Sequence, residues 1–270
     1  MQTREFFDVL NIQDNNGKAD IIQSLMGGDC LGSYYNNGTV KLYFQGGLRN
    51  RIETQLEEIN IETPFKWKWE KQNKENWILA WQDNFQTIVI DEKLAIIPSW
   101  QDNNPADVVI KIKPGMAFGT GHHETTWLML NQILKYIKPG MSVLDLGAGS
   151  GILSIAAMKL GAGKVDAVEF DKECETNFYE NLELNDITEG VQYHQKDVLN
   201  WNRFNYDLTL ANINRNVIEN LIPILQTSKG MILLSGLLGK DYHMIKKICE
   251  QHNLQVKDKI IKGEWICLAL

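Results

Sequence analysis

The fold is decided by the stretch Ser142-Val-Leu-Asp-Leu-Gly-Ala-Gly-Ser-Gly151. Its first five residues form an apolar run typical of a buried strand, and Ile152-Leu-Ser-Ile-Ala-Ala157 behind the glycines begins a helix. A strand, a glycine-rich turn and a helix in this order place a nucleotide-like ligand at the helix N-terminus. Glycine at the turn lets the backbone bend sharply and approach the ligand closely. The stretch therefore predicts a nucleotide-type binding loop in an α/β fold.

Two details of this loop restrict the class of ligand that it can bind. The dinucleotide fingerprint Gly-x-Gly-x-x-Gly requires its third glycine at the position of Ile152, whereas here Gly151 comes one residue early. The carboxylate of Asp145, at the end of the strand, would repel a pyrophosphate but suits a ligand that carries an ammonium group. We therefore expect Asp145, Gly147 and Gly149 to bind S-adenosylmethionine at its methionine end. A tight turn without a ligand is the alternative.

Acidic residues also follow the next two strands. Glu169 ends the second strand, about twenty residues after the loop, where a carboxylate accepts hydrogen bonds from ribose hydroxyls. Its neighbour Asp171 is interpreted as the N-cap of a helix that begins at Lys172. Asp197, after the third strand, either contacts the adenine amino group or is a simple turn residue. We expect His194 to be a surface histidine.

The acceptor side is predicted from Asn212, which ends the fourth strand. Methyl transfer by in-line displacement requires above all that the lone pair of the acceptor is held in line with the methyl group. The side-chain carbonyl of Asn212 can accept a hydrogen bond from an amine and orient it. Enzymes that methylate exocyclic base amines usually have a proline pair and an aromatic residue here, and Ala211-Asn-Ile-Asn214 has neither. The sequence therefore favours an amine that is not attached to a base.

Strands and helices alternate from residue 86 to the C-terminus. We predict strands at 142–146, 164–170, 191–195, 206–211 and 230–235, and helices at 150–160, 172–184, 214–226 and 239–251. Such alternation is typical of a mostly parallel, doubly wound sheet, here a Rossmann-like domain over 86–270. The last two strands, 255–261 and 264–270, are separated only by Lys262-Gly263 and are predicted to form an antiparallel hairpin.

The first 69 residues are predicted to form a smaller α+β domain. Strands are expected at 4–11, 31–36, 39–45 and 61–69, and helices at 20–26 and 48–59. Asn36-Asn37-Gly38 between two of the strands is a hairpin signal. The order βαββαβ is that of a ferredoxin-like sandwich over 1–69. Residues 70–85 are interpreted as a linker, in which Trp77 and Trp81 share a helix face and pack on a neighbouring domain.

The chain has 270 residues and a formal net charge of −7. Its densest basic group is interleaved with acids: Lys66, Lys68, Glu70, Lys71, Lys74 and Glu75. We interpret this group as a solvated helical or linker face. An acidic chain without a basic patch is not expected to recognise nucleic acid directly, and a basic protein is the better partner.

Cysteine spacing and hydropathy bear on the compartment. The four cysteines include no Cys-x-x-Cys pair, which disfavours disulfides and a zinc site. No run of about eighteen apolar residues predicts a membrane span, and no apolar signal-peptide core follows the polar N-terminus. We therefore expect a cytoplasmic protein.

A second glycine-rich segment lies upstream, Pro114-Gly-Met-Ala-Phe-Gly-Thr-Gly-His-His-Glu-Thr-Thr126. Its glycines predict a lid or a closely packed loop that runs into a helix. Thr125 and Thr126 lie at the helix start, where capping is the simplest role. His122 and His123 could bind a metal ion, but no third ligand is evident nearby, and a lid or packing role is favoured.

Several motifs occur together in a fixed order: Ala117-Phe-Gly-Thr-Gly121, Thr125-Thr126, the loop 145–151, Ala211-Asn-Ile213 and Ser235-Gly236. This set resembles the bacterial ribosomal protein L11 methyltransferases, strongly from about residue 76 onward and weakly before it. The lid motif is the specific part of the resemblance, because class I methyltransferases in general share the cofactor glycines.

The resemblance implies a Rossmann-like methyltransferase domain joined by a flexible linker to a ferredoxin-like domain that grips the ribosomal protein. It also implies S-adenosylmethionine-dependent methylation of lysine side chains and of the α-amine. By position, Thr126, Gly147, Glu169 and Asn212 should contact the cofactor, and this role replaces capping for Thr126. Asn212 is in addition the expected catalytic residue.

The chain departs from the family pattern at several positions. His122 and Glu124 stand where threonine and proline are usual, and Glu169 retains a carboxylate where aspartate is usual. Asn214-Arg215 replaces small apolar residues beside the acceptor site and therefore bears on lysine specificity.

Three other functions remain open. A nicotinamide-dependent oxidoreductase is disfavoured by Asp145 and by the position of the third glycine. A non-catalytic S-adenosylmethionine-binding module that assists ribosome assembly is compatible with the motifs. A nucleic-acid methyltransferase is disfavoured by the residues that follow Asn212. The sequence identifies no proton acceptor, and a monomer is expected.

Overall fold

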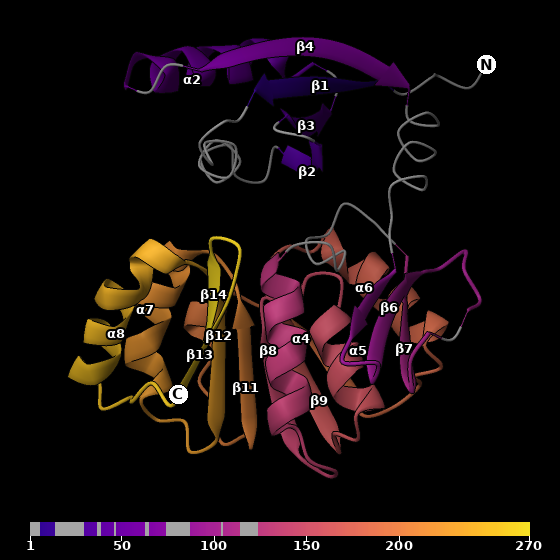
Figure 1. Cartoon of the computed structure of the whole chain (residues 1–270), viewed down its shortest axis with the longest axis vertical. Helices are drawn as coiled ribbons and strands as arrows, with labels where there is room; N and C mark the ends of the chain where they lie inside the picture. The colour runs from indigo at the N-terminus through magenta and orange to yellow at the C-terminus, as the bar shows by residue number, and fades with distance from the viewer. Residues whose placement is uncertain are drawn as a thin grey trace. The chain divides into compact units, whose positions relative to one another are not determined.

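The computed structural model describes residues 6–13, 30–36, 39–45, 47–62, 65–73, 87–103, 105–113 and 124–270. By its internal contacts the chain divides into two compact units, Met1–Phe85 and Gln86–Leu270 (Figure 1). Each unit has its own sheet and its own apolar core. No helix among the described residues is long and apolar enough to cross a bilayer.

The first unit contains a four-stranded sheet and, among its described residues, the helix α2 (Arg49–Glu62). The strands are β1 (Phe6–Gln13), β2 (Cys30–Asn36), β3 (Thr39–Gln45) and β4 (Lys66–Asn73). They lie in the order β2-β3-β1-β4, and every neighbouring pair is antiparallel. A βαββαβ chain that folds into a ferredoxin-like sandwich has this order. The helix expected at 20–26 lies outside the described residues, so the complete βαββαβ order stays a prediction.

Two boundaries in this unit differ from the sequence prediction. The helix α2 runs to Glu62, where the sequence predicts a strand, and β4 begins only at Lys66. Thr63-Pro64 follows α2 in the sequence, and a proline disfavours helical backbone in the residue before it, which ends the helix there. The strand β4 then continues to Asn73, so residues 70–73 belong to the sheet and not to the expected linker. Trp77 and Trp81 lie outside the described residues.

The strand β4 presents different side chains to α2 and to the solvent. Trp67 and Trp69 both donate their indole N–H groups to the carboxylate of Glu53 on α2. Lys66 and Lys68 alternate with the two tryptophans and are exposed. These lysines are therefore solvated as expected, but they lie on a strand rather than on a helix or a linker.

The second unit is built on a seven-stranded sheet, and the Rossmann-like fold is confirmed (Figure 1). Its strands are β8 (Ser142–Leu146), β9 (Lys164–Glu169), β10 (Val191–Gln195), β11 (Leu208–Asn212), β12 (Met231–Leu238), β13 (Asp258–Lys262) and β14 (Trp265–Ala269). They lie in the order β10-β9-β8-β11-β12-β14-β13. All neighbours are parallel except β14, which is antiparallel to β12 and β13. The predicted C-terminal hairpin is thus confirmed.

Helices cover both faces of this sheet. One face carries α4 (Glu124–Tyr136), α5 (Ile152–Lys159) and α6 (Cys174–Leu184). The other face carries α7 (Arg215–Leu225) and α8 (Tyr242–Gln251). Two short 3-10 helices, η2 (Val198–Asn200) and η3 (Gly239–Asp241), lie in the connections that follow β10 and β12. The sheet is therefore enclosed in two apolar layers, as its nearly continuous apolar strands require.

A second sheet in this unit is not predicted by the sequence pattern. It consists of β5 (Ile88–Ile90), β6 (Leu94–Pro98) and β7 (Val108–Ile112), with β6 in the middle. Its buried side chains belong to the same apolar core as those of α4, α5 and α6. Short apolar runs of this kind do not distinguish a strand from a buried helix or loop, which is why they gave no clear signal.

The candidate site is positioned by the middle of the large sheet. β8 leads into α5 on one face, whereas its neighbour β11 leads into α7 on the other face. In open α/β sheets the connections diverge at such a point and leave a crevice at the carboxyl ends of the strands, where ligands bind. The glycine-rich loop 147–151 and Asn212 lie at these two strand ends.

Candidate functional site

The glycine-rich loop after β8 is pressed against neighbouring side chains. Gly147 has a φ of 77° and Gly151 a φ of 82°, in the left-handed region that glycine adopts without strain. A β-carbon at Gly147 would overlap Cγ2 of Ile213. A β-carbon at Gly151 would lie 2.8 Å from the ring of Phe178. Larger residues at either position would displace their neighbours, which gives the glycine spacing a physical reason.

The backbone N–H groups of this loop are already used within the protein. Gly147 and Ala148 both donate to the carbonyl oxygen of Val168, at 2.8 and 3.1 Å. Gly149 donates to Oε2 of Glu169 at 2.9 Å. A pyrophosphate-binding loop offers successive free N–H groups to its ligand. The loop therefore does not suit a dinucleotide, in agreement with the sequence prediction.

Asp145 is fully buried beside the loop, with none of its surface exposed. Its Oδ2 accepts the hydroxyl of Ser154 on α5 at 2.6 Å, whereas its Oδ1 has no hydrogen-bond partner. Burial raises the pKa of this carboxyl to about 6; the Ser154 hydrogen bond opposes the rise, and the charge of Glu169 adds to it. A buried carboxylate oxygen is costly until a donor or cation completes it. Asp145 therefore fits the predicted contact with an ammonium group.

Asn212 ends β11 with an unsatisfied amide oxygen. The residue is 7% exposed, and its Oδ1 makes no hydrogen bond. Strand alternation directs its side chain to the sheet face that is covered by α4 and α5, and the side chain of Asp145 points to the same face. The register pairs Ala211 with Leu146, so Asn212 lies beside the first residue of the loop. Oδ1 of Asn212 is therefore available to accept a hydrogen bond from an amine and to orient it.

Thr126 lies in the first turn of α4, which begins at Glu124. It is fully buried, and its hydroxyl has no hydrogen-bond partner. A capping hydroxyl would accept a backbone N–H, so the capping role is wrong for Thr126. The unsatisfied hydroxyl fits the cofactor contact that the family resemblance implies. The predicted lid, with His122 and His123, lies outside the described residues.

Glu169 connects the tip of β9 to the loop. Oε2 of Glu169 accepts the N–H of Gly149, and Oε1 accepts the N–H of Asp171, both at 2.9 Å. Each oxygen keeps a second lone pair that can accept a ribose hydroxyl. Asp171 in turn accepts the N–H of Glu173, in a turn that precedes α6. Because α6 begins only at Cys174, Asp171 stabilises this turn and not, as predicted, the first turn of the helix.

Asp197 and His194 lie at the end of β10. Asp197 accepts the N–H of Leu199 at 2.9 Å and caps η2, so it acts as the turn residue that was one of its two predicted roles. The other role, a contact with the adenine amino group, stays a prediction. His194, expected at the surface, is half-buried, and its Nε2 lies 2.6 Å from Oδ1 of Asp166. The other oxygen of Asp166 accepts the hydroxyl of Tyr206 at 2.9 Å. This partly buried network braces β10 against β9, and its partners are too far apart in the sequence to be recognised there.

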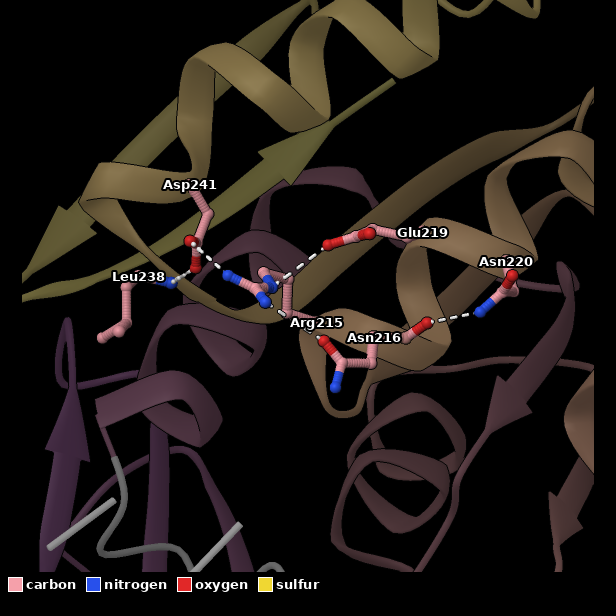
Figure 2. Close-up of polar contacts among 6 residues, drawn as sticks. All are labelled: Arg215, Asn216, Glu219, Asn220, Leu238 and Asp241. Atoms are coloured by element: carbon pink, nitrogen blue, oxygen red, sulfur yellow. Dashed lines mark hydrogen bonds and ion pairs between the residues drawn. The ribbon is translucent and has the colours of Figure 1, made fainter. Parts of the chain in front are cut away.

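Arg215, at the start of α7, is engaged within the protein (Figure 2). Its guanidinium contacts three side chains, those of Asn216, Glu219 and Asp241. Nε lies 3.1 Å from Oε1 of Glu219, and Nη1 lies 3.3 Å from Oδ1 of Asp241. Arg215 therefore fastens the turn after Asn212 to the segment after β12, and the guanidinium is not a free ligand for a substrate carboxylate.

Two polar residues of this region are not predicted by the sequence pattern. Ser154 donates its hydroxyl to Asp145. The sequence feature that could have revealed it is a single hydroxyl residue in the apolar run 152–157. Asn181, on α6, donates to the carbonyl oxygen of Ser150 in the loop at 2.9 Å. The sequence feature that could have revealed Asn181 is the regular spacing of asparagines four residues apart, at 177, 181 and 185.

Comparison with known proteins gives the family. The family model for ribosomal protein L11 methyltransferase (PrmA) matches residues 11–270. The ribosomal protein L11 methyltransferase of Lactobacillus gasseri is 37% identical over 202 residues, which are 73% of this chain and 64% of that protein. The relative of the same name from Ruminiclostridium cellulolyticum is 32% identical over 248 residues, which are 85% of this chain and 78% of that protein.

A solved structure agrees with these relatives. The crystal structure of a ribosomal protein L11 methylase from Lactobacillus delbrueckii subsp. bulgaricus matches with a TM-score of 0.63 and 34% identity. The match covers 68% of this chain and 97% of that one. The chain spans only 64% of the length of several curated relatives that it matches. With the family model matched over nearly all of its residues, the chain belongs to the ribosomal protein L11 methyltransferase family.

Proposed function

We propose that the chain transfers methyl groups from S-adenosylmethionine to amines of ribosomal protein L11. Membership of the family supports this reaction class. The observation that carries the proposal is a set of three buried oxygens without partners, on Thr126, Asp145 and Asn212. They belong to α4, β8 and β11; α4 packs against β11, and β11 pairs with β8. Unsatisfied buried oxygens are costly, and a ligand with several donors would complete them.

The residues around the loop fit this cofactor. Asp145 would bind its ammonium group, and Glu169 would accept hydrogen bonds from its ribose. Gly147 and Gly149 would let the backbone lie close to it, and Asp197 would accept the adenine amino group. The hydroxyl of Thr126 would contact it from α4. When bound, the cofactor supplies an electrophilic methyl group on a sulfonium.

Asn212 would hold the acceptor. Its amide oxygen accepts an N–H of the attacking amine and keeps the nitrogen lone pair in line with the methyl group. A lysine ammonium has no lone pair, so the amine must lose its proton before transfer, and we assign that proton to bulk water. Positioning rather than acid–base catalysis is then the main contribution of the protein.

The acceptors would be lysine side chains and the α-amine of the ribosomal protein. The net charge of −7 favours a basic partner over nucleic acid. We assign recognition of this partner to the first unit, which would act with a monomeric methyltransferase unit in the cytoplasm. The names of the relatives support the substrate, since each is called a ribosomal protein L11 methyltransferase.

Labelling identifies the acceptor. The full chain is incubated with S-adenosylmethionine labelled on its methyl group and, in separate reactions, with purified L11, ribosomal RNA and a ribosome-free extract. Label should appear on L11, in methylated lysines and at the N-terminus. Gly147→Asp should abolish both cofactor binding and labelling, because the new side chain overlaps Ile213 and the ligand space. Label on RNA, or tight cofactor binding with no labelled protein, would overturn the proposal; the second outcome would indicate a non-catalytic binding module.

A further inference from the structure

Two asparagines on α6, Asn177 and Asn181, and its C-cap residue Asn185 face the free edge of β7. Among the described residues β7 pairs only with β6, so its other edge has no neighbouring strand. Asn185 accepts the N–H of Lys111 at 2.9 Å and donates to its carbonyl oxygen at 2.6 Å. Asn177 donates to the carbonyl oxygen of Lys113 at 3.0 Å. The amide side chains of a helix therefore take the place of a neighbouring strand.

Asn181 differs from the other two because it also reaches the cofactor loop. Its Oδ1 accepts the N–H of Lys113 at 2.7 Å, and its Nδ2 donates to the carbonyl oxygen of Ser150 at 2.9 Å. Asn181 is fully buried, and Ser150 is 1% exposed. One amide group thus joins the end of β7 to the middle of the glycine-rich loop.

The amide of Asn181 serves both partners. The backbone N–H of Lys113 needs an acceptor and the carbonyl of Ser150 needs a donor, and these two groups define which end of the amide is oxygen. A carboxylate would set two oxygens facing each other, and an apolar side chain would leave both backbone groups buried without partners. Besides the backbone bonds to Val168, two side chains hold the loop: Asn181 at Ser150 and Glu169 at Gly149.

We propose that Asn181 is a positioning residue for the cofactor, which acts by fixing the Ser150 peptide of the loop. The proposal rests on the proposed function, since it assigns the loop to S-adenosylmethionine. Without the Asn181 bond, the Ser150 carbonyl turns away from α6, and the arch from Gly147 to Gly151 loses the shape that admits the ligand. Cofactor binding is weakened although Asn181 touches no ligand atom.

Asn181→Asp and Asn185→Asp form a matched pair. Both residues are buried, Asn181 on α6 and Asn185 at its C-cap, and both substitutions replace a donating amide by a carboxylate oxygen. Asn185→Asp disturbs bonds to Lys111 and to the carbonyl oxygen of Asn181, but none to the loop. Both variants are expected to unfold at a lower temperature than the parent protein. Only Asn181→Asp should weaken the binding of S-adenosylmethionine, with a Kd raised roughly tenfold, as expected for the loss of one buried hydrogen bond. Calorimetry at about pH 8 measures this Kd.

The kinetic signature is a split between KM and kcat. Asn181→Asp should raise KM for the cofactor while kcat at saturation stays close to that of the parent, because the loop binds ground state and transition state alike. Equal Kd values for the two variants would overturn the proposal, as would an unchanged Kd in Asn181→Asp. If Asn181→Asp does not fold, Asn181→Ala and Asn185→Ala provide the same comparison without a buried charge. A parent protein that does not bind S-adenosylmethionine contradicts the proposed function itself, which separates the two failures.

Discussion

Nη1 of Arg215 lies 3.3 Å from Oδ1 of Asp241, and this contact joins the start of α7 to η3 (Figure 2). The turns that it connects follow β11 and β12, which are neighbours in the sheet. Asp241 uses its other oxygen to accept the N–H of Leu238 at 3.0 Å. Both oxygens of this 6% exposed carboxylate are therefore satisfied. The pair fixes the turn after Asn212 against the end of β12.

Asp241→Asn should reduce both stability and turnover, because an amide has one acceptor oxygen where Arg215 and the N–H of Leu238 each need one. We expect a loss of about 2 kcal/mol in the free energy of unfolding, measured with denaturant, and a severalfold fall in kcat. Glu219→Gln is the control, since it removes the other carboxylate from the same guanidinium but lies on α7 itself and is partly exposed. It should cost less than about 0.5 kcal/mol. If the two substitutions lower stability and turnover equally, the contact between Arg215 and Asp241 is not what fixes the turn after Asn212.

Affinity for the cofactor should fall in acid. The pKa of Asp145 is raised to about 6 by burial, so its carboxyl is increasingly neutral below that pH. An ammonium group binds the ionised form, and at low pH binding must first remove a proton. The Kd should therefore rise about tenfold for each pH unit below about 6 and stay nearly constant from about 7 up to the pKa of about 8 of an α-amino group.

Calorimetry from about pH 5 to about pH 8 measures this dependence directly. Asp145→Asn is the control variant: it should bind more weakly near neutral pH and show no such slope. If the slope persists in Asp145→Asn, the titrating group is another residue.

Thr126→Val should weaken cofactor binding without destabilising the free protein. The substitution keeps the shape and removes a buried hydroxyl that has no partner, so the melting temperature should be unchanged or higher. Loss of one hydrogen bond to the ligand should raise Kd by about three- to tenfold. Thr209→Val, which removes another unsatisfied buried hydroxyl from β11, should leave Kd unchanged. A lower melting temperature with normal affinity would make Thr126 a structural residue only.

Asn212→Ala should separate turnover from cofactor affinity. The loss of the oriented acceptor should lower kcat roughly 100-fold, because a misplaced nucleophile no longer meets the methyl group in line. The Kd for S-adenosylmethionine should change less than about threefold. Single-turnover labelling and calorimetry on the same preparation give both values. A similar loss in both quantities would make Asn212 a cofactor residue rather than a catalytic one.

The features that could be predicted from the sequence are those with a local cause. The loop 147–151 requires glycine because of its own backbone angles, so its spacing is visible in ten consecutive residues. Asp145, Glu169 and Asn212 were found because each lies at or next to the end of a strand, and parallel strands bring their carboxyl ends to one edge of the sheet.

The features that could not be predicted depend on partners distant in the sequence. Arg215 could be recognised as a departure from the family pattern, but its partner Asp241 lies 26 residues away. Asn185 and Lys111 are 74 residues apart. The helix α6 was predicted, but β7 was not, so the role of its asparagines could not be inferred. The same holds for His194, whose partner Asp166 lies on another strand, 28 residues away.

The hydrogen bonds within the glycine-rich loop have a consequence for recognition. Because Gly147, Ala148 and Gly149 direct their N–H groups to Val168 and Glu169, hydrogen bonds within the protein preorganise the loop. The conformational entropy of the loop is lost when the chain folds, and little of it remains to be lost on association. Selectivity then comes from the fit to a rigid surface rather than from closure of the loop itself, and the free and bound loops should superpose.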